Sequence, residues 1–386
     1  MRIAHVTDFY LPRLGGIEMH VGDLAARQVA QGHEVTVITS SPGEGTTDPA
    51  DGPAVVRVTD GLRRPHAFHP QAPFSGAKEL LDGRFDMVHV HVGVASPLGF
   101  WAARTASRAG LPTVVTVHSL WAWAHPIFQA LDRPGGYSRL PIRWTAVSEA
   151  AAGPVRRVVS GPGAVTVLPN GIDPERWDVP RDDRGDDDEI LLVGVMRLAA
   201  RKRPLQMLRM VREVRRRTPA GTRLRVVIVG EGPYRSRLER YLRRHEMTGW
   251  VSLPGRQGRE QIRDLYRRAD VFVAPADLES FGIAALEARC AGVPVVAKGG
   301  NGISEFVRDG RDGLLVADDA AMVDALVRVC AEPALRAALA GHAGAGTVPV
   351  SWTSTLALTD DAYREAAELV GRGASPARTA QPEVIG

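Results

Sequence analysis

Short apolar runs rich in Val and Ile alternate with helix-forming stretches along nearly the whole chain, and this order constrains the fold more than any other feature. In the first half, the pattern predicts strands at residues 3–7, 34–39, 54–58, 87–92, 113–118, 144–148 and 165–169. In the second half, it predicts strands at residues 190–195, 224–230, 251–253, 271–274, 293–297 and 314–317. Strands that alternate with helices favour parallel sheets joined by crossover helices, which is an α/β fold.

The length of 386 residues exceeds what a single core usually serves, so two domains of roughly 150–200 residues are expected. An acidic, proline-bearing stretch at residues 178–188 separates the two sets of strands and is typical of a linker. We therefore predict two doubly wound, Rossmann-like domains at residues 1–178 and 189–350. Ligands of such folds bind at the carboxyl ends of strands, and a cleft between the domains would collect these ends. The tail at residues 371–386, rich in Gly, Ala, Ser and Pro, is predicted to be disordered.

Composition excludes several classes of protein. No apolar run reaches the roughly 18 residues that a membrane-spanning helix needs, and the N-terminus opens into a strand rather than a signal peptide. Cys290 and Cys330 are the two cysteines, too few for a disulfide framework or a cysteine metal site. We expect a cytoplasmic protein.

Positive charge is concentrated between Arg197 and Arg268, where 21 Lys and Arg face 6 Asp and Glu. Most of these arginines alternate with apolar residues at helical spacing, which favours solvated faces of amphipathic helices. Attraction to anionic lipid, with peripheral contact at the inner face of the membrane, is the alternative. No nucleic-acid motif accompanies the charge, so a nucleic-acid partner is not expected.

Two carboxylates, Glu279 and Glu287, flank a predicted helix start that follows the strand at 271–274. The backbone amides of residues 280–283 would lie at the N-terminus of this helix, where unpaired N–H groups favour anions and hydroxyl oxygens. Carboxylates accept hydrogen bonds from hydroxyl donors. The segment therefore suits a ligand that carries hydroxyls at both ends and a phosphate. A capped helix start with a solvated glutamate is the alternative.

Three further loops follow predicted strands. Gly15 and Gly16 precede a helix and would allow close approach of a phosphate, although an ordinary strand–helix turn explains them equally well. His118 ends a strand and is either a ligand contact or a histidine satisfied within the core. Arg197 and Lys202 follow the strand at 190–195 and would reach one diphosphate, Arg as a fork and Lys as a point charge.

Taken in order, these motifs resemble retaining glycosyltransferases of family 4, the glycosyl transferases group 1, which have the two-domain architecture called GT-B. The resemblance covers nearly the whole chain and rests on Gly15-Gly16, His118, Val147-Ser148-Glu149, Asn170-Gly171-Ile172-Asp173, Gly194, Arg197, Lys202, Gly230-Glu231-Gly232-Pro233, the Glu279–Glu287 segment and Trp352. It implies an acceptor-side first domain, a nucleotide-sugar-binding second domain, and a C-terminal helix at 351–370 that packs back on the first.

The resemblance also implies a UDP- or GDP-sugar donor and a role for each residue. Glu287 would accept hydrogen bonds from the ribose, and Glu279 would hold hydroxyls of the transferred sugar. Arg197 and Lys202 would neutralise the diphosphate.

The remaining roles are implied in the same way. Gly15 and Gly16 would contact the diphosphate, and His118 would contact the 6-hydroxyl of the sugar. The backbone amides of Phe281, Gly282 and Ile283 would also contact the sugar. The backbone from Leu253 to Arg256 would contact the base. His118, Arg197, Lys202 and Glu279 would be the catalytic set.

Cations held in place stabilise the charge that develops on a departing diphosphate. No side-chain nucleophile is evident, so the family mechanism of same-face hexosyl transfer to an acceptor hydroxyl is expected. No metal and no cofactor besides the donor substrate are expected. A nucleotide-sugar epimerase of the same architecture and a non-catalytic sugar-nucleotide-binding protein are the alternatives.

Two segments depart from the family pattern or leave the acceptor open. Lys298 stands where the family usually has a small polar residue. We interpret it as a surface lysine, and a residue that tunes donor or phosphate contacts is the alternative. The aromatic residues of 120–128 line an acceptor pocket, contact a membrane or pack within the first domain. The acceptor, small or lipid-linked, is not specified by these residues.

Overall fold

The computed structural model describes residues 1–13, 15–43, 52–62, 66–121, 124–159, 165–180, 189–345 and 348–373. The chain divides into two units, each built around its own sheet. The first unit comprises Met1–Val147, Ala151–Leu168 and Thr355–Gly386, and the second comprises Ser148–Ala150 and Pro169–Ser354.

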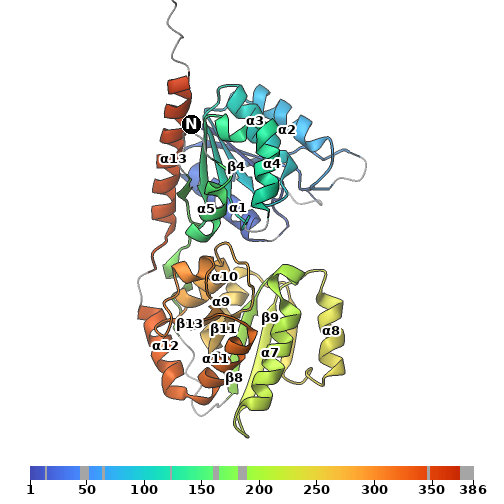
Figure 1. Ribbon diagram of the computed structural model, residues 1–386, viewed down its shortest axis with the longest axis vertical. Coiled ribbons are helices and arrows are strands. Elements are labelled where there is room, and N and C mark those ends of the chain that lie inside the picture. The colour runs from blue at the N-terminus through green and yellow to red at the C-terminus, as the bar shows by residue number, and fades with distance from the viewer. Residues whose placement is uncertain are drawn as a thin grey trace, which may run out of the picture. The chain divides into compact units, whose positions relative to one another are not determined.

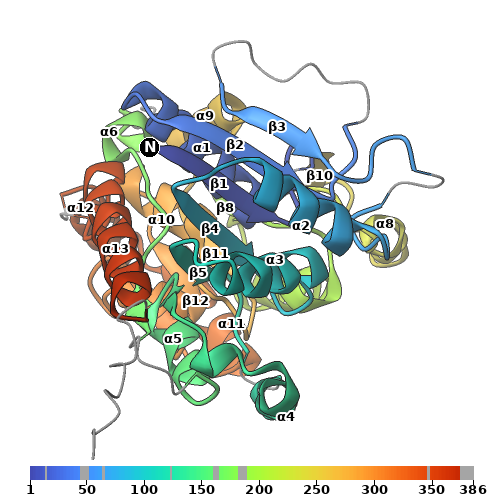
Figure 2. The same cartoon turned by 90° about the horizontal axis from the view of Figure 1, so that it is seen from above.

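The first unit contains a seven-stranded parallel sheet in the order β3-β2-β1-β4-β5-β6-β7. Its strands are β1 (Arg2–Thr7), β2 (Glu34–Thr39), β3 (Ala54–Arg57), β4 (Met87–Val92), β5 (Thr113–Val117), β6 (Ile142–Ala146) and β7 (Thr166–Val167). Figure 2 shows β3, β2, β1 and β4 side by side. The strands β4, β5 and β6 are buried along their whole length, as expected for a parallel sheet covered on both faces.

Helices cover this sheet. They are α1 (Gly16–Ala30), α2 (Ala72–Asp82), α3 (Pro97–Arg108), α4 (His125–Gly135), α5 (Glu149–Arg156) and the long C-terminal α13 (Trp352–Gly373). A short 3-10 helix η1 (Tyr137–Arg139) follows α4. Figure 1 shows α13 in red beside the strands of the first unit. Tyr363 and Ala366 of α13 belong to the same core as Ile3, and Glu365 forms an ion pair with Arg143 at 2.5 Å.

The second unit contains a six-stranded parallel sheet in the order β10-β9-β8-β11-β12-β13. Its strands are β8 (Glu189–Val195), β9 (Arg223–Val229), β10 (Val251–Gly255), β11 (Val271–Ala274), β12 (Val295–Lys298) and β13 (Gly313–Val316). Both sheets therefore have the doubly wound order 3-2-1-4-5-6 within their own unit, with one further strand in the first.

The helices of the second unit are α6 (Pro174–Trp177), α7 (Pro204–Arg217), α8 (Arg235–Arg244), α9 (Arg259–Arg268), α10 (Ile283–Cys290), α11 (Asp319–Ala331) and α12 (Pro333–Ala345). Two 3-10 helices, η2 (Ala200–Lys202) and η3 (Gly302–Glu305), lie in its loops. Leu208 of α7, Leu238 of α8 and Leu326 of α11 join the strands in one core. Within the described residues, no helix is both long enough and apolar enough to cross a bilayer.

The predicted fold class is confirmed, since each predicted strand range overlaps a strand of the structure. Several boundaries move: the strand predicted at 144–148 lies at Ile142–Ala146, and that predicted at 293–297 begins at Val295. The prediction of a disordered tail was wrong for residues 371–373, which continue α13. Residues 181–188 of the predicted linker and 374–386 of the tail lie outside the described residues.

The turn after β9 requires glycine for space as well as for conformation. At Gly230, with φ +134°, an added Cβ would lie 1.9 Å from the carbonyl oxygen of Met196, whereas at Gly221, with φ +96°, it would meet nothing within 4 Å. We expect Gly230→Ala to lower the free energy of unfolding by about 3 kcal/mol or more, and Gly221→Ala by about 1 kcal/mol. Urea denaturation of both variants measures the difference. Equal losses of unfolding free energy in the two variants would show that the close contact with the Met196 carbonyl does not add to the cost of a side chain at Gly230.

Candidate functional site

The switch point of the second sheet lies between β8 and β11, the central strands whose following loops run in opposite directions. Doubly wound folds bind their ligands at this point, beyond the carboxyl ends of the strands. The loop after β8 carries Arg197 and Lys202, and the loop after β11 carries Glu279. The topology of the second unit thus brings three of the predicted site residues to one edge of one sheet.

Backbone hydrogen bonds hold Arg197 at this edge. The N–H of Met196 donates to Val229 O at 3.0 Å, and the N–H of Leu198 donates to Glu231 O at 2.9 Å. Leu198 is fully buried, whereas the Arg197 side chain is exposed. The turn that contains Gly230 and Gly232 therefore positions the arginine and leaves its guanidinium accessible.

Lys202 and Glu279 form an ion pair across the two loops. Their side chains are 23% and 14% exposed, so the pair is partly shielded from water. The backbone of Glu279 is fixed as well, because its carbonyl accepts a hydrogen bond from the N–H of Gly302 at 2.9 Å. A cation and a carboxylate thus lie together at the place where a sugar phosphate would offer an anion beside hydroxyls.

The loop after Glu279 turns directly into α10. Gly282 is its N-cap with φ +90°, and an added Cβ there would lie 2.5 Å from the side chain of Ile303, so glycine is required. Phe281 is buried against Phe306, which leaves its backbone rather than its side chain as a possible contact. The N–H groups that precede Ile283 lie at a helix N-terminus, as the sequence predicted.

The other residues of this unit that were predicted to contact the donor lie on α10 and around β10, apart from the Lys202–Glu279 ion pair. Glu287 lies on α10 and is partly exposed. Leu253 lies in the middle of β10 and Arg256 directly follows this strand, and the carbonyl of Leu253 accepts a hydrogen bond from Arg235 at 2.9 Å. The structure leaves their predicted roles toward ribose and base as predictions.

Lys298 was predicted to be a surface lysine, and this was wrong. Its side chain is 9% exposed and contacts both Asp277 and Asp319 at 2.6 Å. Arg203 contacts the same two carboxylates, with a two-bond fork to Asp319 at 2.7 Å. We call these four residues the charge quartet.

Three members of the charge quartet have pKa values shifted in the direction of stable ion pairs. Burial lowers the pKa of Lys298, but its hydrogen bonds to Asp277 and Asp319 outweigh burial, and the net pKa lies above the ordinary value. The hydrogen bond from Arg203 holds the pKa of Asp319 below its usual value, and the same bond raises the pKa of Arg203. These shifts favour the charged forms of Arg203, Lys298 and Asp319. Arg203 adjoins Lys202, and Asp277 lies two residues before Glu279, so the quartet fixes both loops that carry the ion pair.

In the first unit, the glycine loop is shaped by a residue that the sequence prediction omitted. An added Cβ on Gly15 would lie 2.3 Å from the carboxylate of Glu18, which is buried and paired with Arg13 at 3.0 Å. Around Gly16, in contrast, no described atom lies within 4 Å of an added Cβ. A side chain at Gly15 would thus displace the Glu18 carboxylate, whereas the space beside Gly16 is open.

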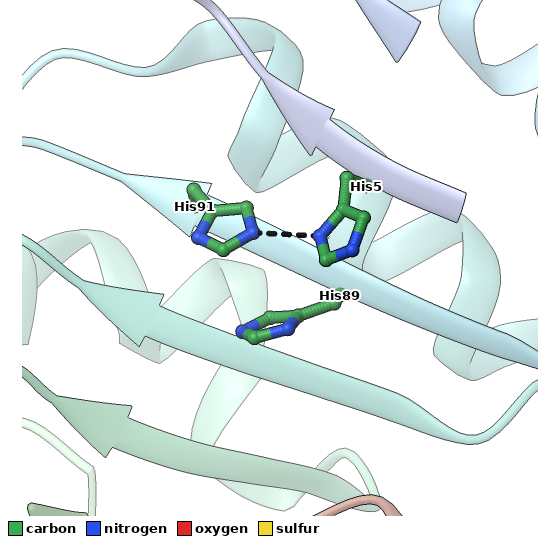
Figure 3. A group of neighbouring side chains, drawn as sticks. All are labelled: His5, His89 and His91. Carbon is green, nitrogen blue, oxygen red and sulfur yellow. Dashed lines mark hydrogen bonds between the residues drawn. The ribbon is translucent and has the colours of Figure 1, made fainter. Parts of the chain in front are cut away.

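His118 lies at the end of β5 and belongs to a cluster of buried histidines with His5 of β1, His20 of α1, and His89 and His91 of β4. Figure 3 shows His5, His89 and His91, which come from two adjacent strands and gather on one face of the sheet. His91 Nδ1 lies 3.0 Å from His118 Nε2, and His91 Nε2 lies 2.9 Å from His5 Nδ1. Burial lowers the pKa of His5 to about 4 and that of His118 to about 3, so both rings are neutral at pH 7.

Asp8 is a second residue that the sequence analysis did not single out. It follows β1, is buried, and accepts hydrogen bonds from the N–H groups of Leu98 and Gly99 at 3.0 and 3.1 Å. It therefore caps the first turn of α3. Burial raises the pKa of Asp8 to about 7, although these hydrogen bonds oppose the shift.

The aromatic segment after His118 packs inward where it is described. Trp121 is buried, stacks on Phe128 with ring centroids 4.0 Å apart, and also contacts Trp144 and Phe100. Of the three interpretations, packing within the first unit therefore holds for Trp121. Residues 122 and 123 lie outside the described part of the chain.

Two family models match the chain, Glycosyltransferase Family 4 over residues 14–176 and Glycosyl transferases group 1 over residues 175–343. A D-inositol 3-phosphate glycosyltransferase of Actinosynnema mirum is 30% identical, with 92% of this chain and 93% of that protein covered. The chain belongs to the group 1 glycosyltransferases. Another relative of this glycosyltransferase is a glycogen synthase of Mycobacterium tuberculosis, also 30% identical, with 86% of this chain and 87% of that protein covered.

Solved structures share the fold. The Anabaena protein Alr3699/HepE in complex with UDP and glucose has a TM-score of 0.70 at 17% identity, with 97% of this chain and 98% of that chain covered. Sucrose-phosphate synthase from Thermosynechococcus elongatus has a TM-score of 0.76 at 19% identity, with 94% and 98% covered. The glycosyltransferase thus has the GT-B fold that its motifs predicted.

The charge quartet can be tested through its lysine. Lys298→Met leaves Asp277 and Asp319 with Arg203 alone, and we expect the free energy of unfolding to fall by about 1–3 kcal/mol, since both carboxylates keep partial contact with water. Lys78→Met is the matched control, because that lysine is 74% exposed in a pair with Asp82. Urea denaturation should show no measurable change for the control. An equal, negligible effect in both variants would contradict a structural role for Lys298.

The histidine cluster predicts sensitivity to acid. Burial lowers the pKa of His5, His20, His89, His91 and His118 below 6.5, so the unfolded chain binds more protons than the native one below that pH. Stability is therefore fully present above about pH 6.5 and is lost toward pH 4, by about 1.4 kcal/mol per pH unit for each histidine. The raised pKa of Asp8 acts in the opposite direction, but it is one group against five.

Urea denaturation between pH 8 and pH 5 measures this dependence, and His118→Gln should make it shallower. A free energy of unfolding that stays constant over this range would contradict the neutral state of the cluster.

Proposed function

We propose that this glycosyltransferase is a retaining hexosyltransferase that takes its sugar from a nucleoside diphosphate sugar and transfers it to an acceptor hydroxyl. The observation that carries the proposal is the Lys202–Glu279 ion pair at the switch point of the second sheet. A phosphate bonded to a sugar presents negative charge and hydroxyl donors a few ångströms apart. One cation beside one carboxylate matches that chemistry.

Donor binding rearranges the ion pair rather than creating new charges. Lys202 moves its charge-assisted hydrogen bond from Glu279 to a phosphate oxygen, and the carboxylate then accepts from sugar hydroxyls. Arg197 adds a second cation from the same loop, with its guanidinium already exposed to solvent. The charge quartet keeps the two loops in place during this exchange, so little reorganisation is required.

Catalysis follows from the charge that develops when the bond between the anomeric carbon and the phosphate oxygen breaks. Arg197 and Lys202 stabilise the departing diphosphate, and the partly shielded setting of Lys202 strengthens its effect over that in water. No side-chain nucleophile is assigned. The leaving phosphate oxygen helps to take the proton from the acceptor hydroxyl on the same face, so the configuration at the anomeric carbon is retained.

The relatives suggest donors and acceptors to test. HepE is described with UDP-glucose, and the actinobacterial relatives are named as D-inositol 3-phosphate glycosyltransferases. UDP- and GDP-sugars should be offered with inositol phosphates, glucans and lipid-linked acceptors. The anomeric configuration of the product, read by NMR, tests retention. Donor isomerisation without an acceptor would identify an epimerase instead.

Two substitutions separate donor binding from turnover. Lys202→Ala should lower kcat about 100-fold, because a preorganised cation is lost from the leaving group. Glu287→Ala should raise the Kd of the nucleoside diphosphate about tenfold or more, because a charged acceptor of hydroxyl hydrogen bonds is lost. Kinetics and calorimetric titration with nucleoside diphosphates measure the two effects.

Lys78→Ala and Glu368→Ala are the matched controls, since both residues are exposed partners of surface ion pairs. Both should behave as wild type. Wild-type behaviour of Lys202→Ala and Glu287→Ala as well would refute the site.

A further inference from the structure

A continuous hydrogen-bond network runs through the core of the first unit and reaches His118. It begins where the Gln28 amide of α1 meets Tyr363 of α13, with Gln28 Nε2 3.1 Å from the Tyr363 hydroxyl. The amide oxygen of Gln28 lies 2.6 Å from His5 Nε2. From His5 the network continues to His91 and then to His118.

The amide of Gln28 determines the position of every proton in this branch. Its oxygen only accepts, so His5 must carry a proton on Nε2, and a neutral ring then accepts at Nδ1. The proton of the next bond must come from His91 Nε2, since the facing atom of His5 is an acceptor. By the same step His118 carries its proton on Nε2 and donates to His91 Nδ1.

A second branch starts from the same tyrosine and does not reach His118. Having accepted from Gln28, Tyr363 donates to His89 Nδ1 at 3.0 Å. His89 Nε2 then donates to the Thr116 hydroxyl at 2.7 Å, and Thr116 donates to Thr145, which donates to the carbonyl of Val115. Both branches are therefore complete with all rings neutral.

The three histidines of Figure 3 place ligand atoms within 4.8 Å of one another, which is also compatible with a metal ion. Each ring nitrogen of His5, His89 and His91 has, however, a hydrogen-bond partner of its own at 2.6–3.0 Å. A metal ion would replace several of these bonds and interrupt both branches. The geometry favours a proton-ordered network.

We propose that Gln28, His5 and His91 are positioning residues that hold His118 in the tautomer with its proton on Nε2. The Nδ1 atom of His118 is then an acceptor, so a group that bonds to it must donate, as a sugar hydroxyl does. This inference rests on the proposed function in one respect, that His118 contacts the substrate sugar. The tautomer itself depends only on the first unit.

The orientation of the Gln28 amide decides the tautomers of this branch, because turning the amide by 180° would move the proton of each histidine in the branch to its other ring nitrogen. The amide nitrogen would then donate to His5 Nε2, and His118 would carry its proton on Nδ1 and repel a second donor. The Val115 carbonyl at the end of the second branch selects the observed orientation: it only accepts, so Thr145, Thr116, His89 and Tyr363 must each donate toward it, and the Tyr363 oxygen is left to accept from Gln28. Gln28, which is three hydrogen bonds away from His118, thus decides which hydrogen bond His118 makes.

Nitrogen-15 NMR of the full chain with labelled histidine reads the tautomer directly, with signals assigned by single His→Gln variants. We expect one His118 tautomer in the wild type, with Nε2 protonated between pH 6.5 and 9. In Gln28→Met the acceptor for His5 is lost, and His118 should show a mixture of both tautomers. Tyr363→Phe keeps the ring packing and tests the same point if Gln28→Met does not fold.

Two further variants test the network. Thr145→Val removes the bond to the Val115 carbonyl that fixes the direction of the second branch, so it should also give a mixture of His118 tautomers. Gln28→Glu keeps an oxygen toward His5, and its ionised form only accepts, so it should restore the single Nε2 tautomer.

Steady-state kinetics test whether the His118 tautomer affects catalysis. Gln28→Met should lower kcat/KM for the donor about tenfold, the value of one lost hydrogen bond, and Gln28→Glu should recover most of it. A His118 protonated on Nδ1 in the wild type, or an unchanged tautomer in Gln28→Met, would overturn the inference. Zinc that binds stoichiometrically and shifts the His5, His89 and His91 signals would also overturn it. The predicted tautomer in a protein that binds no donor would refute the proposed function alone.

Discussion

Two cations and two carboxylates at the carboxyl edge of the second sheet hold the candidate site of this glycosyltransferase in place. Arg203, Lys298, Asp277 and Asp319 come from four separate segments, and their charges cancel within the group. Because each cation contacts both carboxylates, the loops after β8 and β11 and the start of α11 are fixed together. The neighbouring Lys202–Glu279 pair lies on the same fixed loops and remains partly exposed to water. The site thus combines a closed set of charges that maintains geometry with an adjacent pair that can exchange partners.

The two sheets have the same strand order but use polar residues in opposite ways. In the second unit the charge quartet lies at or beyond the strand ends, and each of its cations has two carboxylates as partners. In the first unit His5, His89 and His91 lie within the strands, where the loss of hydration makes the charged form too costly, and hydrogen bonds between neutral rings satisfy them instead. The histidines have no carboxylate partner in this network, so ordered protons take the place of ion pairs.

The sequence correctly predicted the features that depend on residues close together in the chain. Runs of β-branched residues located the strands, and the turn after 271–274 correctly placed a helix start beyond Glu279. Lys298 was misjudged because its partners, Asp277 and Asp319, lie 21 residues away in either direction on other elements, and no local pattern reports such a pairing. The histidine network was missed for the same reason, although His89 and His91 stand two apart in a strand and must share a face. The ion pair of Glu18 and Arg13 could have been predicted from the sequence. Glu18 stands three residues after Gly15, and a carboxylate is favoured in the first turn of a helix.

The network also joins segments that lie far apart in the sequence. Tyr363 supplies the junction of both branches, and its partners Gln28 and His89 were synthesised more than 270 residues earlier. Until α13 leaves the ribosome, the buried histidines of the nascent first unit lack the hydroxyl that completes their bonding. The sheet strands of the second unit, at residues 189–316, are translated before that moment. The core of the first unit, whose strands are made first, is therefore the one that is completed last.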